Sequence, residues 1–496
     1  MKLTTLLLFF IPCLLTAMLP QRAHAAGQGN TDRSVLLLSG DYPDPTVLKD
    51  GDDYYMTHSA FSYDRGFLIW HSRDLLHWKP LCRADVKFTG SVWAPDLAKV
   101  DGKYYIYFPA NGTNYVAWAD DIRGPWHGPV DLKVGGIDPG HVLDVATGKR
   151  YLLLSGGAIV PLSDDGLRVV GKSKTVYRSW PIPHDWQVEC DCLEGPKALW
   201  HDGYYHIIAA QGGTAGPATS HMATDQRSQH LYGPWELSPV NPVVHTHSAQ
   251  EPWWSKGHGT VVEGPDHQWW IIYHGYRAHM HSLGRHTLAQ PVKWVDGWVV
   301  ADSAAALPKK LDNNKNLPLS DDFKSHELGL QWALWQEWVG DNCTVGDHRL
   351  TLEGKGNGPA DGRKLLCNAY DEKYEISVEL LLPQAAGGKA EGGLLLFYDE
   401  HGFAGITADG ESIKIWNGAK VVTTLPNTCG SKLKLRLVND SNRVDVMVGN
   451  QPVARYLDVS RLHHNVLGGF MSLRPALLAA GTGLVAYKKF RYKTLH

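Results

Sequence analysis

Four acidic residues, each next to a proline or one residue away from it, recur in the first half of the chain: Asp44, Asp96, Asp138 and Glu194. Proline fixes its own φ and holds the residue before it extended, so these carboxyl groups lie on stiff backbone. A positioned carboxyl is what general acid–base chemistry requires, and like charges brought close raise the pKa of at least one partner. An acid at a strand entry can also simply cap a turn, and for any one of the four alone that is the commoner role.

The acids belong to a repeat in which an aromatic pair follows each acidic segment by about ten residues. The leading aromatic residues are 50, 47, 53 and 65 residues apart, at Tyr54, Tyr104, Tyr151, Tyr204 and Trp269. Periods near 50 indicate repeated supersecondary units. Apolar runs such as YYIYF and YLLLSG begin at the aromatic positions and show no helical periodicity. Five such units of four short strands predict an all-β fold, a five-bladed β-propeller.

In such a ring the first strand of every blade faces the central axis, so equivalent positions converge on one spot. We expect these positions to hold the four acids and, in the degenerate fifth copy, His258. Acids that only capped turns would lie at the blade rims instead. Converging carboxyl groups suit hydrolysis of a glycoside with inversion, in which one carboxylate activates water and one carboxylic acid protonates the leaving oxygen.

The length of 496 residues exceeds what one hydrophobic core organises, so at least two domains are expected. Residues 34–302 carry the repeats, and a linker of low apolar content follows at 303–320. In the remainder, 321–496, segments such as YEISVELLLP and KLKLRLV alternate apolar and polar residues with the period of a strand. This pattern predicts a β-sandwich.

The N-terminus predicts export. Lys2 precedes an apolar run from Leu6 to Leu19, and Ala23-His24-Ala25 follows, which is typical of a signal peptide spanning 1–25. We therefore expect a secreted or periplasmic protein, with no later stretch apolar enough to span a membrane. A net charge of −3 without a run of Lys or Arg argues against nucleic acid and anionic membranes as partners.

Cleavage of this signal would leave six cysteines, Cys82, Cys190, Cys192, Cys343, Cys367 and Cys429. An even number in an exported protein permits disulfides, with fifteen possible full pairings. Cys190 and Cys192 lie just before Glu194, where a C-x-C segment could alternatively form a metal or redox site. No second cysteine pair lies nearby in the sequence to support that alternative.

Taken together, the motifs resemble glycoside hydrolase family 43, whose members are five-bladed propellers acting on xylosides and arabinosides. The matching segments follow in the family's order: PDP at 43–45, WAPD at 93–96, IDP at 137–139, EGP at 194–196, GHG at 257–259 and GR at 284–285. The resemblance implies that Asp44 is the general base, Glu194 the general acid, and Asp138 the residue that adjusts pKa and orients.

The same resemblance implies further site residues. Trp93, Asp96 and Arg285 would line the sugar site, and Phe61 would lie near the terminal sugar. His258 resembles an axial histidine that in some members helps to hold a cation or water, which would allow a structural Ca²⁺ in the channel. An ordinary hydrogen-bonded core histidine is an equal alternative, and no cofactor is required for the reaction.

The second domain is similar to the concanavalin-like sandwich appended to many β-xylosidases of this family, where it walls off the active site. We therefore expect an exo-acting enzyme that releases terminal pentose from hemicellulose, most simply β-1,4-linked D-xylose from xylo-oligosaccharides or xylan side chains. An α-L-arabinofuranosidase or a bifunctional enzyme fits the same motifs. A non-catalytic carbohydrate-binding propeller is the alternative from another class. The oligomeric state stays open.

Overall fold

The computed structural model of the chain describes residues 32–88, 90–383 and 389–496, which lie, apart from Asp32, in the compact unit Arg33–His496. The expected signal peptide, 1–25, lies outside the described residues. Strands dominate, and the helical elements in the described ranges are α1 (His464–Leu467) and the 3-10 turns η1 (Ser155–Gly157), η2 (His281–Leu283) and η3 (Asn313–Asn316). None of these is long and apolar enough to cross a membrane.

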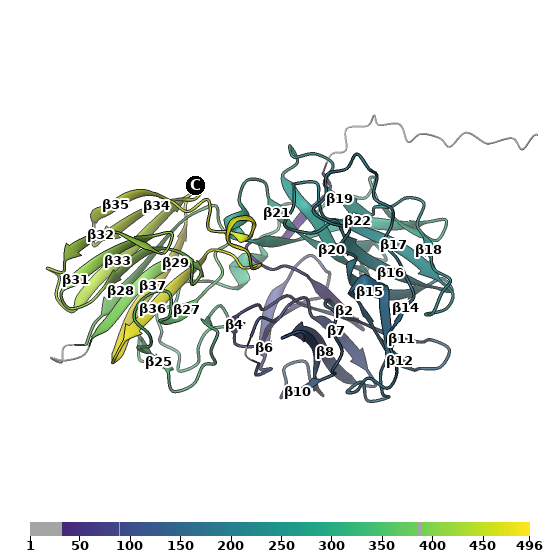
Figure 1. Cartoon of the computed structure of the whole chain (residues 1–496), viewed down its shortest axis with the longest axis horizontal. Coiled ribbons are helices and arrows are strands. Elements are labelled where there is room, and N and C mark those ends of the chain that lie inside the picture. Colours follow the sequence, from purple (N-terminus) through teal and green to yellow (C-terminus); the bar gives the residue numbers. More distant parts are fainter. Residues whose placement is uncertain (1–31, 89, 384–388) are drawn as a thin grey trace, which may run out of the picture. The chain divides into compact units, whose positions relative to one another are not determined.

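Five antiparallel sheets, drawn in purple to teal in Figure 1, follow the five sequence repeats. The first contains β2 (Thr46–Asp50), β3 (Asp53–Thr57), β5 (Phe67–Ser72) and β6 (Lys79–Ala84). The second contains β7 (Asp96–Val100), β8 (Lys103–Ala110), β9 (Thr113–Ala119) and β10 (His127–Asp131). The third contains β11 (Gly140–Leu143), β12 (Arg150–Leu154), β13 (Ala158–Pro161) and β14 (Lys174–Thr175).

The last two sheets each add a strand beside the basic four. The fourth contains β15 (Glu194–His201), β16 (Tyr204–Gln211), β17 (Met222–Ser228), β18 (Glu236–Leu237) and β19 (Val244–His245). The fifth contains β20 (Trp253–Glu263), β21 (Trp269–Arg277), β22 (Arg285–Val295), β23 (Trp298–Ala301) and, from the N-terminal side, β1 (Val35–Leu38). Because β1 pairs with β22, the two ends of the repeat region are joined within one sheet. The prediction of a five-bladed propeller is confirmed.

Two further sheets follow in the sequence and appear in green to yellow in Figure 1. One contains β32 (Lys420–Pro426), β31 (Ser412–Asn417), β30 (Gly402–Ala408), β29 (Ala390–Asp399), β36 (Arg474–Gly481), β27 (Arg363–Leu366) and β24 (Ala333–Trp335), with β4 (Tyr63–Asp64) at its edge. The other contains β25 (Cys343–Gly346), β26 (Arg349–Glu353), β37 (Leu484–Thr494), β28 (Lys373–Leu381), β33 (Lys432–Asp440), β34 (Arg443–Val448) and β35 (Gln451–Asp458). A single apolar cluster draws buried side chains from both sheets, for example Leu394 and Leu435, which is the expected β-sandwich.

The propeller sequence and the sandwich are joined by direct pairing as well as by packing. Strand β4 comes from the first repeat, yet Tyr63 pairs with Trp335 in β24 of the sandwich. Asp41, three residues before Asp44, accepts a hydrogen bond at Oδ2 from Arg474 Nη2 at 3.2 Å. Asn368 exchanges two hydrogen bonds with the Asp41 backbone, at 3.1 and 3.0 Å. The segment that leads to the first predicted catalytic acid is therefore held by the sandwich.

Candidate active site

A pocket of about 120 Å³ contains all of the sequence-predicted site residues except one. Its lining residues come from all five blades and from one loop of the sandwich: Asp44, Phe61, Trp93, Ala94, Ile137, Asp138, Glu194, Thr214, His258, Arg285 and Phe470. The three acids assigned to chemistry lie in this one pocket. The fold thus brings together three carboxyl groups that span 150 residues of the sequence.

The backbone aims the axial side chains by adopting a conformation that non-glycine residues rarely take. Asp44, Asp138 and His258 have φ of 55°, 55° and 54°, in the left-handed region. The expectation that proline holds the residue before it extended is therefore wrong for Asp44 and Asp138. Such strain persists where the surrounding structure over-determines it, often at functional sites. Gly195, with φ of 58°, is required for a second reason, since a Cβ there would lie 2.9 Å from the His258 ring. The EGP segment therefore depends on its glycine.

Asp44 is held as a carboxylate by several donors. Arg285 donates from Nη1 to Oδ1 at 3.0 Å and from Nη2 to Oδ2 at 3.3 Å, and the Ser59 hydroxyl donates to Oδ2 at 2.5 Å. The Asp44 amide donates to His274 Nδ1 at 3.0 Å, which fixes the backbone. Burial alone would raise the pKa of Asp44, but the Arg285 guanidinium and the neighbouring imidazoles hold this pKa well below its usual value. Asp44 can therefore accept a proton across the physiological pH range.

Asp138 and Glu194 are tuned in the opposite direction. Burial, and then the negative charge of Asp44, raise the pKa of Asp138 to about 7, while its Oδ2 accepts a hydrogen bond from the Gly195 amide at 3.1 Å. Burial, and then the charges of Asp138 and Asp44, raise the pKa of Glu194 well above its usual value. Glu194 is therefore a protonated acid at pH values where Asp44 is ionised. This division between two carboxyl groups is the pattern of a general base and a general acid.

Aromatic rings form the walls around Arg285. Its guanidinium carbon lies 5.8 Å from the centroid of the Phe61 ring and 5.3 Å from that of Phe470, on opposite domains of the chain. Trp93 meets Phe470 edge to face, with centroids 5.9 Å apart, and its side chain is partly exposed at the pocket. Phe61 and Trp93 were expected here, whereas Phe470 was not. A planar cation between apolar rings offers both hydrogen bonds and flat surface to a sugar.

Asp96 is the predicted site residue that the structure places elsewhere. It lies three residues before Lys99, the partner of Tyr104, whereas Asp44 lies five residues before Lys49, the partner of Tyr54. Asp96 is therefore two residues further along its strand than Asp44, and the equivalent position in the second blade is Ala94. Its carboxylate accepts hydrogen bonds from the Lys197 ammonium at 2.8 Å, the Thr46 hydroxyl at 3.1 Å and the His141 amide at 2.7 Å. By the same measure Asp138 lies four residues before Val142, the partner of Tyr151, and Glu194 lies seven before His201, the partner of Tyr204. The expectation that the four acids share one repeat phase is therefore wrong, and the contacts of Asp96 are what set it apart from the pocket.

His258 lies on the axis as expected, with Nδ1 3.4 Å from Asp44 Oδ1 and 3.9 Å from Asp138 Oδ2. Burial lowers its pKa to about 3, so the ring is neutral. Asp44, His258 and His274 place possible ligand atoms within 4.8 Å of one another. However, Ca²⁺ prefers six to eight oxygen ligands, and His274 Nδ1 already accepts the Asp44 amide. These side chains do not fit calcium, and no step of the chemistry is assigned to a metal.

Several residues at the site carry no signal that the sequence alone could reveal. Ser59 and His274 contact Asp44, and the Thr214 hydroxyl lies 3.3 Å from His274 Nε2. Phe470 lies in an irregular segment of the sandwich. A single Ser, Thr or Phe in a loop is too common for its type to indicate a site. Only His274, in the strand after the GHG segment, sits near a motif that could have drawn attention to it.

A second hollow adjoins the pocket. It measures about 310 Å³ and is lined by the segments Ser91, Trp93, 109–113, Gly136 and Ile137. Trp93 and Ile137 line both spaces, so the indole separates the pocket that holds the acids from the neighbouring hollow. Trp93 Nε1 donates to Ser91 Oγ at 2.6 Å, which fixes the orientation of the indole.

A five-bladed propeller with paired carboxyl groups in an axial pocket defines a class of carbohydrate-active proteins. The family model of glycosyl hydrolases family 43 matches residues 36–299. The chain belongs to this family.

Individual relatives agree with this assignment. The chain is 32% identical over 310 residues to a xylan 1,3-β-xylosidase of a Vibrio species, which covers 53% of this chain and 56% of that protein. It is 31% identical over 340 residues to the non-reducing end α-L-arabinofuranosidase BoGH43B of Bacteroides ovatus, which covers 60% of each. The matched region thus spans little more than half the length of these relatives.

The similarity extends further in three dimensions. The crystal structure of the GH43 protein BlXynB from Bacillus licheniformis superimposes with a TM-score of 0.80 at 25% identity, over 93% of this chain and all of that one. The shared fold therefore includes the sandwich as well as the propeller.

Proposed function

We propose that this protein is an inverting glycoside hydrolase that releases a terminal pentose, most simply β-linked D-xylose, from oligosaccharides or side chains of hemicellulose. One observation carries the proposal. Asp44, whose pKa is lowered, and Glu194, whose pKa is raised, line the same small pocket. Base and acid are therefore in their working protonation states together.

In the proposed reaction, Asp44 removes a proton from a water molecule as its oxygen attacks the anomeric carbon. The bond from that carbon to the glycosidic oxygen breaks, and Glu194 gives its proton to the departing oxygen. Asp138, which receives the Gly195 amide hydrogen bond, keeps Glu194 protonated through its proximity. Arg285 orients Asp44 and presents donors toward the sugar.

Two features of the walls favour release of single sugars from chain ends. Phe470, from the sandwich, lines one side of the pocket together with Arg285 and Phe61, so a polysaccharide has less room to run through. The hollow beyond Trp93 offers space for the leaving group next to the pocket. We accordingly propose hemicellulose oligosaccharides as the substrate class.

Two other activities remain candidates. A relative matched over 60% of this chain is named an α-L-arabinofuranosidase, so arabinofuranosides are the second substrate to test. A non-catalytic sugar-binding propeller would also use a pocket with aromatic walls, but it would have no use for carboxyl groups tuned in opposite directions. Because residues 1–25 have the pattern of a signal peptide, we propose that the protein acts in the periplasm or outside the cell.

The test compares initial rates on aryl β-D-xyloside and aryl α-L-arabinofuranoside and follows the first sugar released by proton NMR. We expect a higher kcat/KM on the xyloside and α-xylose as the first product, because a single displacement inverts the anomeric carbon. β-Xylose as the first product would contradict inversion. Binding of xylobiose without turnover of any glycoside would favour the sugar-binding alternative.

A further inference from the structure

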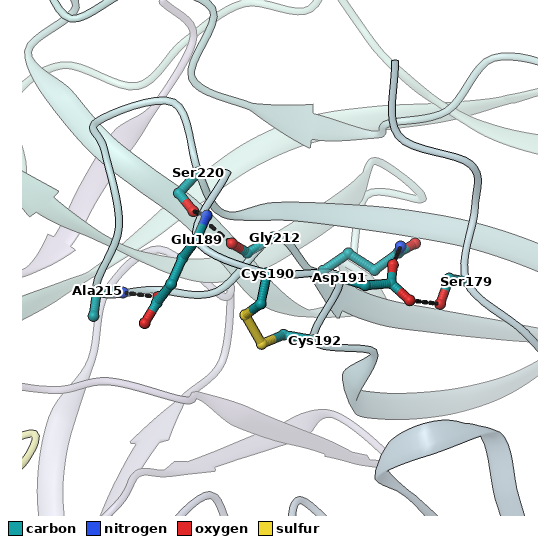
Figure 2. Close-up of a disulfide and its surroundings, with 9 residues drawn as sticks. Ser179, Glu189, Cys190, Asp191, Cys192, Gly212, Ala215 and Ser220 are labelled. Atoms are coloured by element: carbon teal, nitrogen blue, oxygen red, sulfur yellow. Dashed lines mark hydrogen bonds between the residues drawn. A yellow bond between two sulfur atoms is a disulfide. The ribbon is translucent and has the colours of Figure 1, made fainter. Parts of the chain in front are cut away.

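The loop that leads into Glu194 is closed by a disulfide between Cys190 and Cys192 (Figure 2). The two cysteines are separated by Asp191 alone, and their Cα atoms are 5.3 Å apart. Both are half-buried, so the bridge is within reach of a small reductant. The remaining cysteines of the described residues, Cys82, Cys343, Cys367 and Cys429, are free. The bridge therefore lies next to the proposed general acid, with Leu193 alone between Cys192 and Glu194.

The bridged loop is fastened to the end of β16 and to the segment after it, as Figure 2 shows. The Gly212 amide donates to the Asp191 carbonyl at 3.1 Å, and the Ala215 amide donates to Glu189 Oε2 at 2.8 Å. The Asp191 carboxylate accepts hydrogen bonds from the Ser179 hydroxyl at 2.5 Å and from Gln211 Nε2 at 2.9 Å. These hydrogen bonds hold Glu189 and Asp191, the two residues on either side of Cys190.

The bridge also packs directly against the segment that carries part of the pocket wall. A Cβ on Gly213 would lie 2.9 Å from Cys190 Sγ and 2.5 Å from Glu189 Oε2. Only glycine allows this approach, and its φ of 78° is again left-handed. The next residue, Thr214, lines the pocket. A change in the bridged loop would therefore be transmitted to the pocket wall as well as to Glu194.

Glu194 depends on this backbone for its position. Among the described residues the Glu194 carboxyl has no hydrogen-bond partner, in contrast to Asp44 and Asp138. The Glu194 backbone pairs with Ala210, but the register of β15 shifts between Glu194 and Lys197. The regular hydrogen-bond ladder of β15 therefore does not hold Glu194 in place either. Cys192 has φ of 40°, a strained value for a non-glycine residue that relaxes unless its surroundings hold it.

We propose that the Cys190–Cys192 disulfide is a positioning element for the general acid, and that its reduction selectively weakens protonation of the leaving group. The inference rests on the proposed function, because it assigns a role to Glu194. Reduction consumes two electrons and two protons. One thiolate of dithiothreitol attacks a cysteine sulfur, and the protein S–S bond breaks to give a mixed disulfide and one protein thiol. The second dithiothreitol thiol then attacks the dithiothreitol sulfur of the mixed disulfide, which forms cyclic oxidised dithiothreitol and releases the second protein thiol.

The experiment compares wild type with the double variant Cys190→Ser/Cys192→Ser. Because a small displacement of a catalytic group is costly, kcat on xylobiose should fall about 10-fold or more. On an activated aryl xyloside, whose leaving group needs little protonation, kcat should fall less than about 3-fold. Dithiothreitol should lower wild type toward the double variant and leave the double variant unchanged. Cys429→Ser, which removes an exposed free thiol, is the matched control and should behave as wild type.

Hydrogen exchange gives a readout that does not depend on activity. The amides of Cys190, Gly212 and Ala215, which fasten the loop, should exchange faster in the double variant, while those of the sandwich strands stay unchanged. The positioning role would be overturned if the double variant exchanged its amides as wild type does and had the same kcat as wild type on both substrates. Equal losses on both substrates would also overturn it, since they indicate general damage. If wild type hydrolyses no glycoside, the proposed function fails, yet the exchange result still tests the role of the bridge.

Discussion

Two buried carboxylates follow a proline in neighbouring blades, and the structure uses them differently. Asp44 reaches the axial pocket from a left-handed backbone position and faces Arg285. Asp96 begins strand β7 and forms an ion pair with Lys197, in which both side chains are at most 10% exposed. The two acids differ in the backbone conformation that carries them and in the cation that each contacts. The comparison shows that a Pro-Asp dipeptide specifies a stiff acid but not the place to which the acid points.

The largest expected effect concerns the acids in the pocket. Glu194→Gln should lower kcat on xylobiose by about 10²–10⁴-fold, and less on an activated aryl glycoside, because only the poor leaving group needs the proton. Asp44→Asn should lower kcat on both substrates by similar factors, since both need the attacking water. Steady-state kinetics on the two substrates measures this contrast. Equal losses for Glu194→Gln on both would argue against its role as the acid.

Asp96 should respond in stability more than in rate. Asp96→Asn leaves the Lys197 ammonium buried without its counter-charge, which should cost about 3–5 kcal/mol in the free energy of unfolding. The same variant should keep kcat within about 10-fold of wild type, because Asp96 lies outside the pocket. Urea denaturation and kinetics on the same preparation provide the measurement. Asp96→Asn/Lys197→Met, which removes both charges, should recover most of the lost stability.

Asp138 sharpens the comparison through pH. Its folded pKa of about 7 lies above its unfolded value, so its contribution to stability is complete below about pH 4 and is lost as pH rises through 7. Between these limits, wild type should lose ~4 kcal/mol of unfolding free energy relative to Asp138→Asn. Asp52→Asn, at an exposed turn, is the control and should track wild type. A pH-independent difference between wild type and Asp138→Asn would contradict the burial of an ionisable group here.

The smallest expected effect concerns the wall contributed by the sandwich. Phe470→Ala removes one of the two rings beside Arg285 and should raise KM for xylobiose about 3–10-fold, the equivalent of ~1 kcal/mol. The rate constant kcat should change less, because the variant keeps both Asp44 and Glu194. Val466→Ala, in the same segment but exposed, serves as the matched control. An unchanged KM would show that the sandwich does not shape the sugar site.

The repeat in the sequence determined much of the fold. The period near 50 residues and the strand-like runs predicted five blades, and the alternating segments after residue 321 predicted a second β-domain. Both parts of that fold class are confirmed. These features are local, since turn residues and the two-residue strand period are encoded within each segment. The pairing of β1 with β22 and of β4 with β24 joins residues far apart in the chain. No local sequence pattern predicted either pairing.

The sequence by itself determined which carboxyl groups and glycines could form the site, because residue types and neighbouring prolines can be read directly from short segments of the chain. Only the tertiary structure decided that Asp44, Asp138 and Glu194 line one pocket whereas Asp96 pairs with Lys197, that Phe470 reaches the pocket from the sandwich, and that Cys190 pairs with Cys192. The physical reason is that pKa, burial and contact depend on neighbours in space. Two acids that follow a proline in the same way can therefore have entirely different neighbours in space.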